Sequence, residues 1–91
     1  MIGSFRSKAL RRFWEEGDRR GLRPDMVRRI AYLLDALETA AVLKETDVLG
    51  AHLHMLRGKP TRYALRVNKN WRITFGWSAD GAQDVDLEDY H

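Results

Sequence analysis

The stretch that decides the fold is residues 62–77, "RYALRVNKNWRITFGW". On both sides of its central turn, large apolar side chains alternate with polar or small ones. A period of two is that of a β-strand whose two faces meet different surroundings. The link through Lys69 and Asn70 is short enough for a hairpin between two such strands. Arginine, alanine and threonine stand on one face of this hairpin. The large apolar residues stand on the other: Tyr63, Leu65, Val67, Trp71, Ile73, Phe75 and Trp77.

The same period continues on both sides of the hairpin. Residues 51–58, "AHLHMLRG", alternate in this way. Residues 84–89, "DVDLED", follow the turn "SADGAQ" and predict a last strand with Val85 and Leu87 directed inward. The alternation gathers polar residues on the opposite face: His54, Arg66, Arg72, Asp86, Glu88 and, in the same phase, Tyr90. Because this face lacks apolar cover, it is a candidate site.

The N-terminal half has a different period. "MIGSF" predicts a short strand, and "KALRRFWEEG" predicts a helix that is capped by Ser7 and ends at Gly17. Pro24 suits the first position of a second helix over residues 24–41. We therefore expect an α+β fold in which an N-terminal strand and a helical hairpin pack on one face of a mainly antiparallel sheet. The length of 91 residues fits one domain, residues 1–91.

Composition limits the function classes. Cysteine is absent, no apolar run is long enough for a membrane span, and the N-terminus lacks the apolar core of a signal peptide. We expect a cytoplasmic protein without disulfides and without a membrane contact. The net charge is +3, and the segment from Arg57 to Arg72 holds six cations and no acid: Arg57, Lys59, Arg62, Arg66, Lys69 and Arg72. Such a segment suggests a polyanion partner such as nucleic acid, although a solvated surface would also explain it.

The polar face carries groups that suit RNA cleavage without a metal ion. In that reaction a base takes the proton of a 2′-hydroxyl, an acid protonates the leaving 5′-oxygen, and a cation offsets the charge on the phosphate. His54, Tyr90 and His91 handle protons, and the Arg72 guanidinium is a planar fork suited to phosphate. The basic residues near them would hold the RNA backbone: Arg57, Lys59, Arg66 and Lys69. The spacing of His52 and His54 fits no strong metal motif, so we expect neither a metal nor a cofactor.

Each of these residues also has a simpler interpretation. His54 would be a hydrogen-bonded surface histidine, and Arg72 would pair across the sheet with Asp86 or Glu88. Tyr90 would cover the edge of the core, and His91 would be an idle chain end. From the residues alone, the sequence indicates a small basic α+β nucleic-acid binder or nuclease and no more.

Three segments resemble one known family. "HLHMLRG" at 52–58, "VNKNWRITF" at 67–75 and "VDLEDYH" at 85–91 are similar to the HigB-type toxins of bacterial type II toxin–antitoxin systems, within the RelE/ParE superfamily. The resemblance extends over essentially the whole chain. It implies a ribosome-dependent mRNA endonuclease that is neutralised by a HigA-like helix-turn-helix antitoxin. Operator DNA would be contacted only through the antitoxin complex.

By position, the resemblance implies that His54 is a catalytic residue, that Arg72 contacts the scissile phosphate, and that Asp89, Tyr90 and His91 form an active-site tail. Arg57 stands where the family often has lysine. The sequence departs from the family pattern at three positions: Ala51, Met55 and Arg66. The first two affect the course of the strand around His54, and the third adds a positive charge.

Two other functions fit the same superfamily. The first is a ParE-like toxin that poisons gyrase by contact and cuts nothing, since a shared fold does not fix function. The second is a non-toxic adaptor that only binds an antitoxin. Proton-handling residues such as His54 and Tyr90 favour the nuclease, because a pure binder has no need of them.

Overall fold

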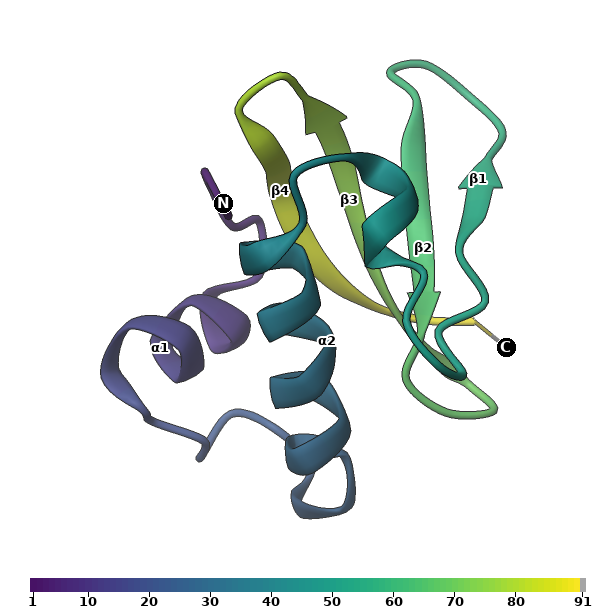
Figure 1. Ribbon diagram of the computed structural model, residues 1–91. Helices are drawn as coiled ribbons and strands as arrows, with labels where there is room; N and C mark the ends of the chain where they lie inside the picture. Colours follow the sequence, from purple (N-terminus) through teal and green to yellow (C-terminus); the bar gives the residue numbers. More distant parts are fainter. Residues whose placement is uncertain (91) are drawn as a thin grey trace.

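Helices come first along the chain and strands second, as the change of period predicted. The computed structural model describes residues 1–90. Its helical elements are α1 (Lys8–Glu16), the 3₁₀ turn η1 (Pro24–Met26), α2 (Val27–Thr39) and the 3₁₀ turn η2 (Leu43–Thr46). Its strands are β1 (His54–Leu56), β2 (Arg62–Arg66), β3 (Trp71–Ser78) and β4 (Gly81–Asp89). In Figure 1, α1 and α2 lie together on one side of the sheet, so the fold is α+β.

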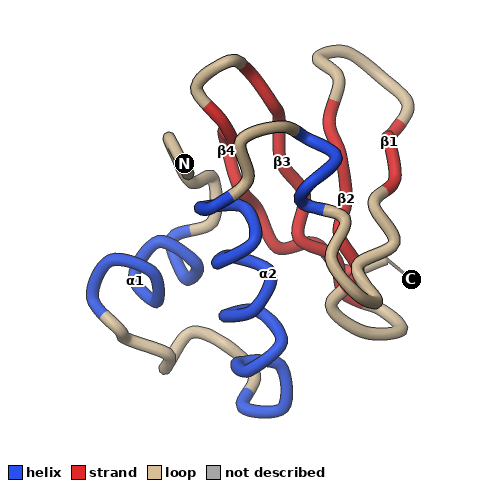
Figure 2. Tube along the Cα trace, in the orientation of Figure 1, coloured by secondary structure: helices blue, strands red, loops and turns tan. Residues whose placement is uncertain are grey.

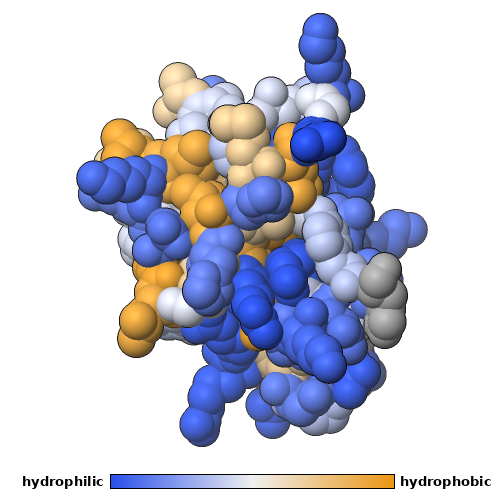
Figure 3. Space-filling model, turned by 90° about the vertical axis from the view of Figure 1, so that its right-hand side faces the viewer, coloured by the Kyte–Doolittle hydropathy of each residue, from blue (hydrophilic) through white to orange (hydrophobic). Residues whose placement is uncertain are grey.

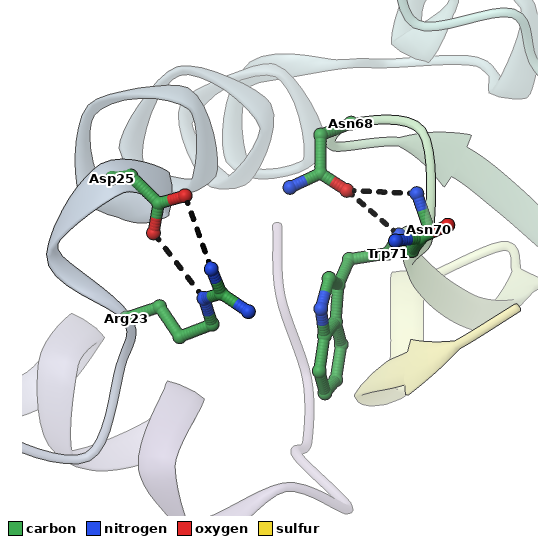
Figure 4. Close-up of polar contacts among 5 residues, drawn as sticks. All are labelled: Arg23, Asp25, Asn68, Asn70 and Trp71. Atoms are coloured by element: carbon green, nitrogen blue, oxygen red, sulfur yellow. Dashed lines mark hydrogen bonds and ion pairs between the residues drawn. The ribbon is translucent and has the colours of Figure 1, made fainter. Parts of the chain in front are cut away.

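The four strands form one antiparallel sheet in the order β1-β2-β3-β4, so every strand pairs with its neighbour in the chain (Figure 2). The β2–β3 hairpin is closed by the Asn68 side chain, whose Oδ1 accepts hydrogen bonds of 2.9 Å from the backbone N–H groups of Asn70 and Trp71 (Figure 4). This confirms the hairpin predicted from residues 62–77.

Local signals set the helix ends. The Ser7 hydroxyl accepts a 3.1 Å hydrogen bond from the Leu10 N–H, and Gly17 ends α1 with a φ of 70°, which favours glycine. Pro24 begins a 3₁₀ turn and not an α-helix, and an Arg23–Asp25 ion pair joins the residues on either side of it (Figure 4). The second helix is therefore shorter than residues 24–41, because Ala40 is already extended.

The core lies between the helices and the apolar face of the sheet. Helix side chains that are fully buried include Leu10, Ile30, Leu33, Leu34 and Leu37, and they meet Leu65, Ile73, Phe75 and Val85 of the sheet. Burying one such side chain stabilises the fold by ~1.5–3 kcal/mol. Trp71 and Leu87 are partly buried against this core, on the face that alternation predicted. Neither α-helix in the described part of the chain is long and apolar enough to cross a membrane.

The predicted N-terminal strand is wrong. Residues 1–5 make two isolated parallel bridges to β4, Ile2 to Ala82 and Phe5 to Val85, and no continuous ladder. The interruption coincides with Asp84, whose φ of 49° breaks the extended course of β4 between the two bridges. The alternation of "MIGSF" contains no sign of this bulge in a strand that lies about 80 residues away.

Candidate active site

The face of the sheet that points away from the helices is called the outer face below. The register defines it in two cross-strand rows: His54, Ala64, Thr74 and Asp86 in one, and Arg66, Arg72 and Glu88 in the other. Directly opposite residues share a face, so the strands bring together residues that are far apart in the sequence. This is the polar face that the alternation predicted.

An open cleft of about 700 Å³ lies on this face. Four residues expected at the site line it: His54, Arg66, Arg72 and Tyr90. The opposite wall comes from the segment after η2, which also contributes His52. That segment is fixed to β2 by a 2.7 Å hydrogen bond from the Arg66 N–H to the Ala51 carbonyl, and Arg29 bonds the carbonyls of Leu49 and Arg66. The wall is therefore tied to the sheet at several points.

Arg72 is held by neutral acceptors. Its Nη1 donates hydrogen bonds of 2.6 Å to the Asn68 carbonyl and 3.0 Å to the Trp71 carbonyl. Its guanidinium carbon lies 5.6 Å from the centroid of the Tyr90 ring, a cation–π contact. Within residues 1–90 Arg72 makes no ion pair, so the alternative of a salt bridge to Asp86 or Glu88 is wrong. The charge of Arg72 remains available for an anion in the cleft.

Tyr90 lies at the end of β4 and is anchored there. Its backbone N–H donates a 2.5 Å hydrogen bond to the Asn70 carbonyl, and its ring is 42% exposed beside Arg72. Asp89 differs, because it lies opposite Trp71 in the register and does not line the cleft. The structure therefore brings Tyr90 to the cleft but not Asp89. His91 lies outside the described residues.

A second hollow, of about 330 Å³, lies on the other side of Tyr90. Arg57 and Lys59, both expected to bind RNA, line it, whereas Lys69 lines neither hollow. Arg6 also lines it, and sequence reasoning missed this residue. The parallel bridge between Phe5 and Val85 carries Arg6 there, and no local pattern in the sequence reveals that bridge.

A hydrogen-bonded trio sits at the centre of the outer face. The Arg62 guanidinium donates to the Thr74 hydroxyl at 3.1 Å and to the Asp84 carbonyl at 2.8 Å, and the Thr74 hydroxyl donates to Glu88. Thr74 is fully buried, so its hydroxyl needs these partners. Partial burial, and then the nearby Arg6, lower the pKa of the Arg62 guanidinium, while Glu88 and other acids oppose that shift.

The arrangement suits acid–base chemistry on a phosphate. One cleft is lined by two imidazoles, a phenol, two guanidiniums and the carboxylate of Asp47, and its walls are open to a large ligand. Among the described residues, no three His, Asp or Glu side chains form a group that could hold a metal ion. The two guanidiniums could stabilise negative charge that develops on a phosphate in the cleft.

Two comparisons with known proteins show what the chain is similar to. Residues 3–91 match the family model described as "RelE-like toxin of type II toxin-antitoxin system HigB". The chain is also 37% identical over 92 residues to "Endoribonuclease HigB" of Proteus vulgaris, and the match covers 100% of both chains.

Proposed function

Because the chain belongs to the HigB-like family of RelE-like toxins of type II toxin–antitoxin systems, and is related over its full length to an endoribonuclease, we propose that it cuts mRNA on the ribosome without a metal ion. The observation that carries this proposal is the cleft in which His54, Arg72 and Tyr90 meet. Cutting translated mRNA would stop protein synthesis, which is how the toxin would act.

The proposed reaction is an internal phosphoryl transfer. A base removes the proton of a ribose 2′-hydroxyl, and the 2′-oxygen forms a bond to the adjacent phosphorus. The bond from phosphorus to the 5′-oxygen of the next nucleotide breaks, and an acid protonates that oxygen. The products are a 2′,3′-cyclic phosphate and a new 5′-hydroxyl. His54 and Tyr90 are the described groups that would move these protons, and His91 is proposed as a third.

Arg72 has the electrostatic role in this scheme. The phosphate gains negative charge as the 2′-oxygen attacks, and a fixed guanidinium stabilises that charge without reorganising. Two backbone carbonyls and the Tyr90 ring already hold the Arg72 side chain in the cleft. Arg66, which is exposed at the same cleft, would bind the RNA backbone. Asp89 would support the tail from outside the cleft.

A toxin of a type II system has a cognate antitoxin. We propose that this partner is a HigA-like helix-turn-helix protein and that operator DNA is contacted only through the complex of the two. We also propose that the toxin works in the cytoplasm, because its substrate would be mRNA engaged by ribosomes. No cofactor is needed by the scheme.

The experiment is to express the chain without an antitoxin and to map new RNA 5′ ends across the transcriptome. Cuts within translated frames are expected, and they should disappear in His54→Ala or when translation is blocked beforehand. His54 is exposed on a short edge strand, so its replacement should leave the fold intact, which circular dichroism checks. Growth arrest with intact mRNA and DNA damage signalling would instead identify a ParE-like binding toxin. Unchanged growth and translation would identify an adaptor.

A further inference from the structure

The cations that line the second hollow come from three separate segments of the chain. Arg6 comes from the N-terminal segment, Arg57 and Lys59 from the β1–β2 connection, and Arg62 from β2. Among residues 1–90, Glu88 is the one carboxylate that lines it. Four cations thus face one acid in a space of about 330 Å³, on the outer face next to the cleft. In Figure 3, which looks onto the β1 side of the molecule, hydrophilic side chains cover most of the lower and right-hand surface.

Hydrogen bonds position two of the residues that carry these charges. The Arg6 N–H donates a 2.8 Å hydrogen bond to the Val85 carbonyl, which holds the N-terminal segment against β4. Arg62 is held by the Thr74 hydroxyl and the Asp84 carbonyl. Glu88 accepts a hydrogen bond from the Thr74 hydroxyl, so this carboxylate already has a partner. Within residues 1–90, none of the four cations forms a salt bridge.

Holding these like charges together is unfavourable unless an anion joins them. Burial, and then the nearby charge of Arg6, lower the pKa of Arg62, while Glu88, Asp84 and Asp86 oppose that shift. Repulsion of this kind, kept in place by the fold, is relieved when a phosphate enters between the cations. The side chains of Arg6, Arg57 and Lys59 are exposed and free to close on such a ligand.

We propose that this hollow is a second phosphate site, which binds the RNA phosphodiester next to the one held at Arg72. Tyr90 lines both the cleft and the second hollow, so the RNA backbone would pass over the Tyr90 ring between the two phosphates. The proposal rests on the function proposed above and adds Arg6 and Arg62 to the residues that bind substrate. Arg6 is an anchoring residue here, because it lies away from the reacting atoms.

An RNA phosphodiester has two sources on a ribosome, the mRNA and the ribosomal RNA. Because the second hollow shares Tyr90 with the cleft, the mRNA strand is the ligand that reaches both hollows at once. A surface contact with ribosomal RNA would use the same cations but would not depend on mRNA. Binding to ribosomes that carry no mRNA separates these sources.

The main test compares Arg6→Gln with Arg12→Gln, a matched change on α1 at an exposed arginine that lines neither hollow. Both purified variants would cleave mRNA on programmed ribosomes at several salt concentrations. We expect Arg6→Gln to raise KM by about tenfold with little change in kcat, and to make the plot of log kcat/KM against log salt shallower by ~0.7 for one lost contact with single-stranded RNA. Arg6→Lys should restore most of the loss, and Arg12→Gln should behave as the wild type.

The double variant Arg6→Gln/Lys59→Gln adds a second lost contact, while Arg62 is left intact because it also supports Thr74. If the wild type cleaves mRNA and both variants keep its KM and salt slope, the second phosphate site is wrong and the nuclease function stands. If both variants bind empty ribosomes less tightly than the wild type but keep its KM for mRNA, the site binds ribosomal RNA.

A binding assay keeps the test independent of cleavage. Single-stranded RNA oligonucleotides would be titrated into His54→Ala, with and without Arg6→Gln. We expect Arg6→Gln to weaken binding by about tenfold and to reduce its salt dependence. If the wild type cleaves nothing, the proposed function fails, and this titration alone supports or overturns the phosphate site. Equal affinities would overturn it.

Discussion

The arginines of residues 11–25 and those of the outer face have different partners. In the helical half, each arginine that forms an ion pair meets a carboxylate no more than four residues away. The pairs are Arg11–Glu15 at 3.5 Å, Arg20–Asp18 at 2.9 Å and Arg23–Asp25 at 3.3 Å. Local pairs of this kind satisfy their own charge and leave little for a ligand.

On the outer face, neutral groups take the place of those carboxylates. Arg72 donates to two backbone carbonyls and lies over the Tyr90 ring, and Arg62 donates to a hydroxyl and a carbonyl. A carbonyl orients a guanidinium but leaves its net charge uncancelled. The difference teaches that the orientation of an arginine and the neutralisation of its charge are separate properties. A phosphate site needs an arginine that is held in place but whose charge is not neutralised by a carboxylate.

The sharpest way to break this comparison is to remove one arginine from each region. Arg72→Ala should lower kcat for mRNA cleavage on ribosomes by ~10²–10³, the usual effect of losing one fixed donor to a developing charge. Arg23→Ala, which removes an exposed paired arginine, should stay close to wild type. Cleavage of a defined mRNA on purified ribosomes measures both.

Arg72→Lys sharpens the same contrast, because it keeps the charge and loses the fork. We expect its activity to lie between those of Arg72→Ala and the wild type. Thermal unfolding of each variant excludes loss of fold as the cause. Equal activities for Arg72→Ala and Arg23→Ala would show that the outer-face guanidinium has no special role.

A smaller effect is expected where the outer face buries a polar group. Thr74→Val keeps the shape of the side chain but removes the hydroxyl that accepts from Arg62 and donates to Glu88. Leaving these partners unsatisfied should lower the free energy of unfolding by ~1–3 kcal/mol. The matched control is Thr39→Val on α2, where an exposed hydroxyl bonds the Asp35 carbonyl. Urea unfolding should show little change for Thr39→Val, and equal losses would mean that burial at Thr74 is not decisive.

Period two explains why the outer face was predictable. Alternation is a local property, so residues 62–77 were enough to place Arg66 and Arg72 on one face and Leu65 and Ile73 on the other. The short link at Asn68–Asn70 then fixed the antiparallel register of β2 and β3. The polar face, with His54 and Tyr90 on it, followed from alternation, and the fold class followed from the change of period between the two halves of the chain.

The parts that sequence reasoning missed all depend on distant segments. The N-terminal segment forms its two β-bridges to β4 on either side of Asp84, and this association brings Arg6 to the second hollow. The wall of the cleft after η2 is likewise set by bonds to β2 and to Arg29. The role of Asp89 at the site was implied by the family resemblance and stays a prediction, and the register places this residue opposite Trp71.

A further contrast concerns one exposed cation of the cleft. Arg66→Gln should lower kcat/KM by only a few-fold and make its salt dependence shallower by ~0.7, because one backbone phosphate contact is lost. Lys44→Gln, an equal change of charge on η2 outside both hollows, should alter neither quantity. A salt series of single-turnover cleavage measures both variants. If Arg66→Gln and Lys44→Gln change kcat/KM and its salt dependence equally, the overall charge of the protein and not the cleft attracts the RNA.

The smallest effect lies in the paired region. Hydrogen bonds from the Arg20 guanidinium to both oxygens of Asp18, and then one from the Arg20 backbone N–H, lower the pKa of that carboxyl to about 2. Since the folded value lies below the ordinary value of 3.8, the pair contributes stability above about pH 4 and loses it as pH falls through 2. An NMR titration of the Asp18 carboxyl should therefore have its midpoint near 2, and in Arg20→Gln the midpoint should return toward 3.8.

RNA cleavage at neutral pH should not change in Arg20→Gln, because the charge removed was already neutralised by its neighbour. A midpoint that stays near 2 without Arg20 would show that the local pair is not what satisfies the charge here, and the contrast between the two regions would lose one of its supports.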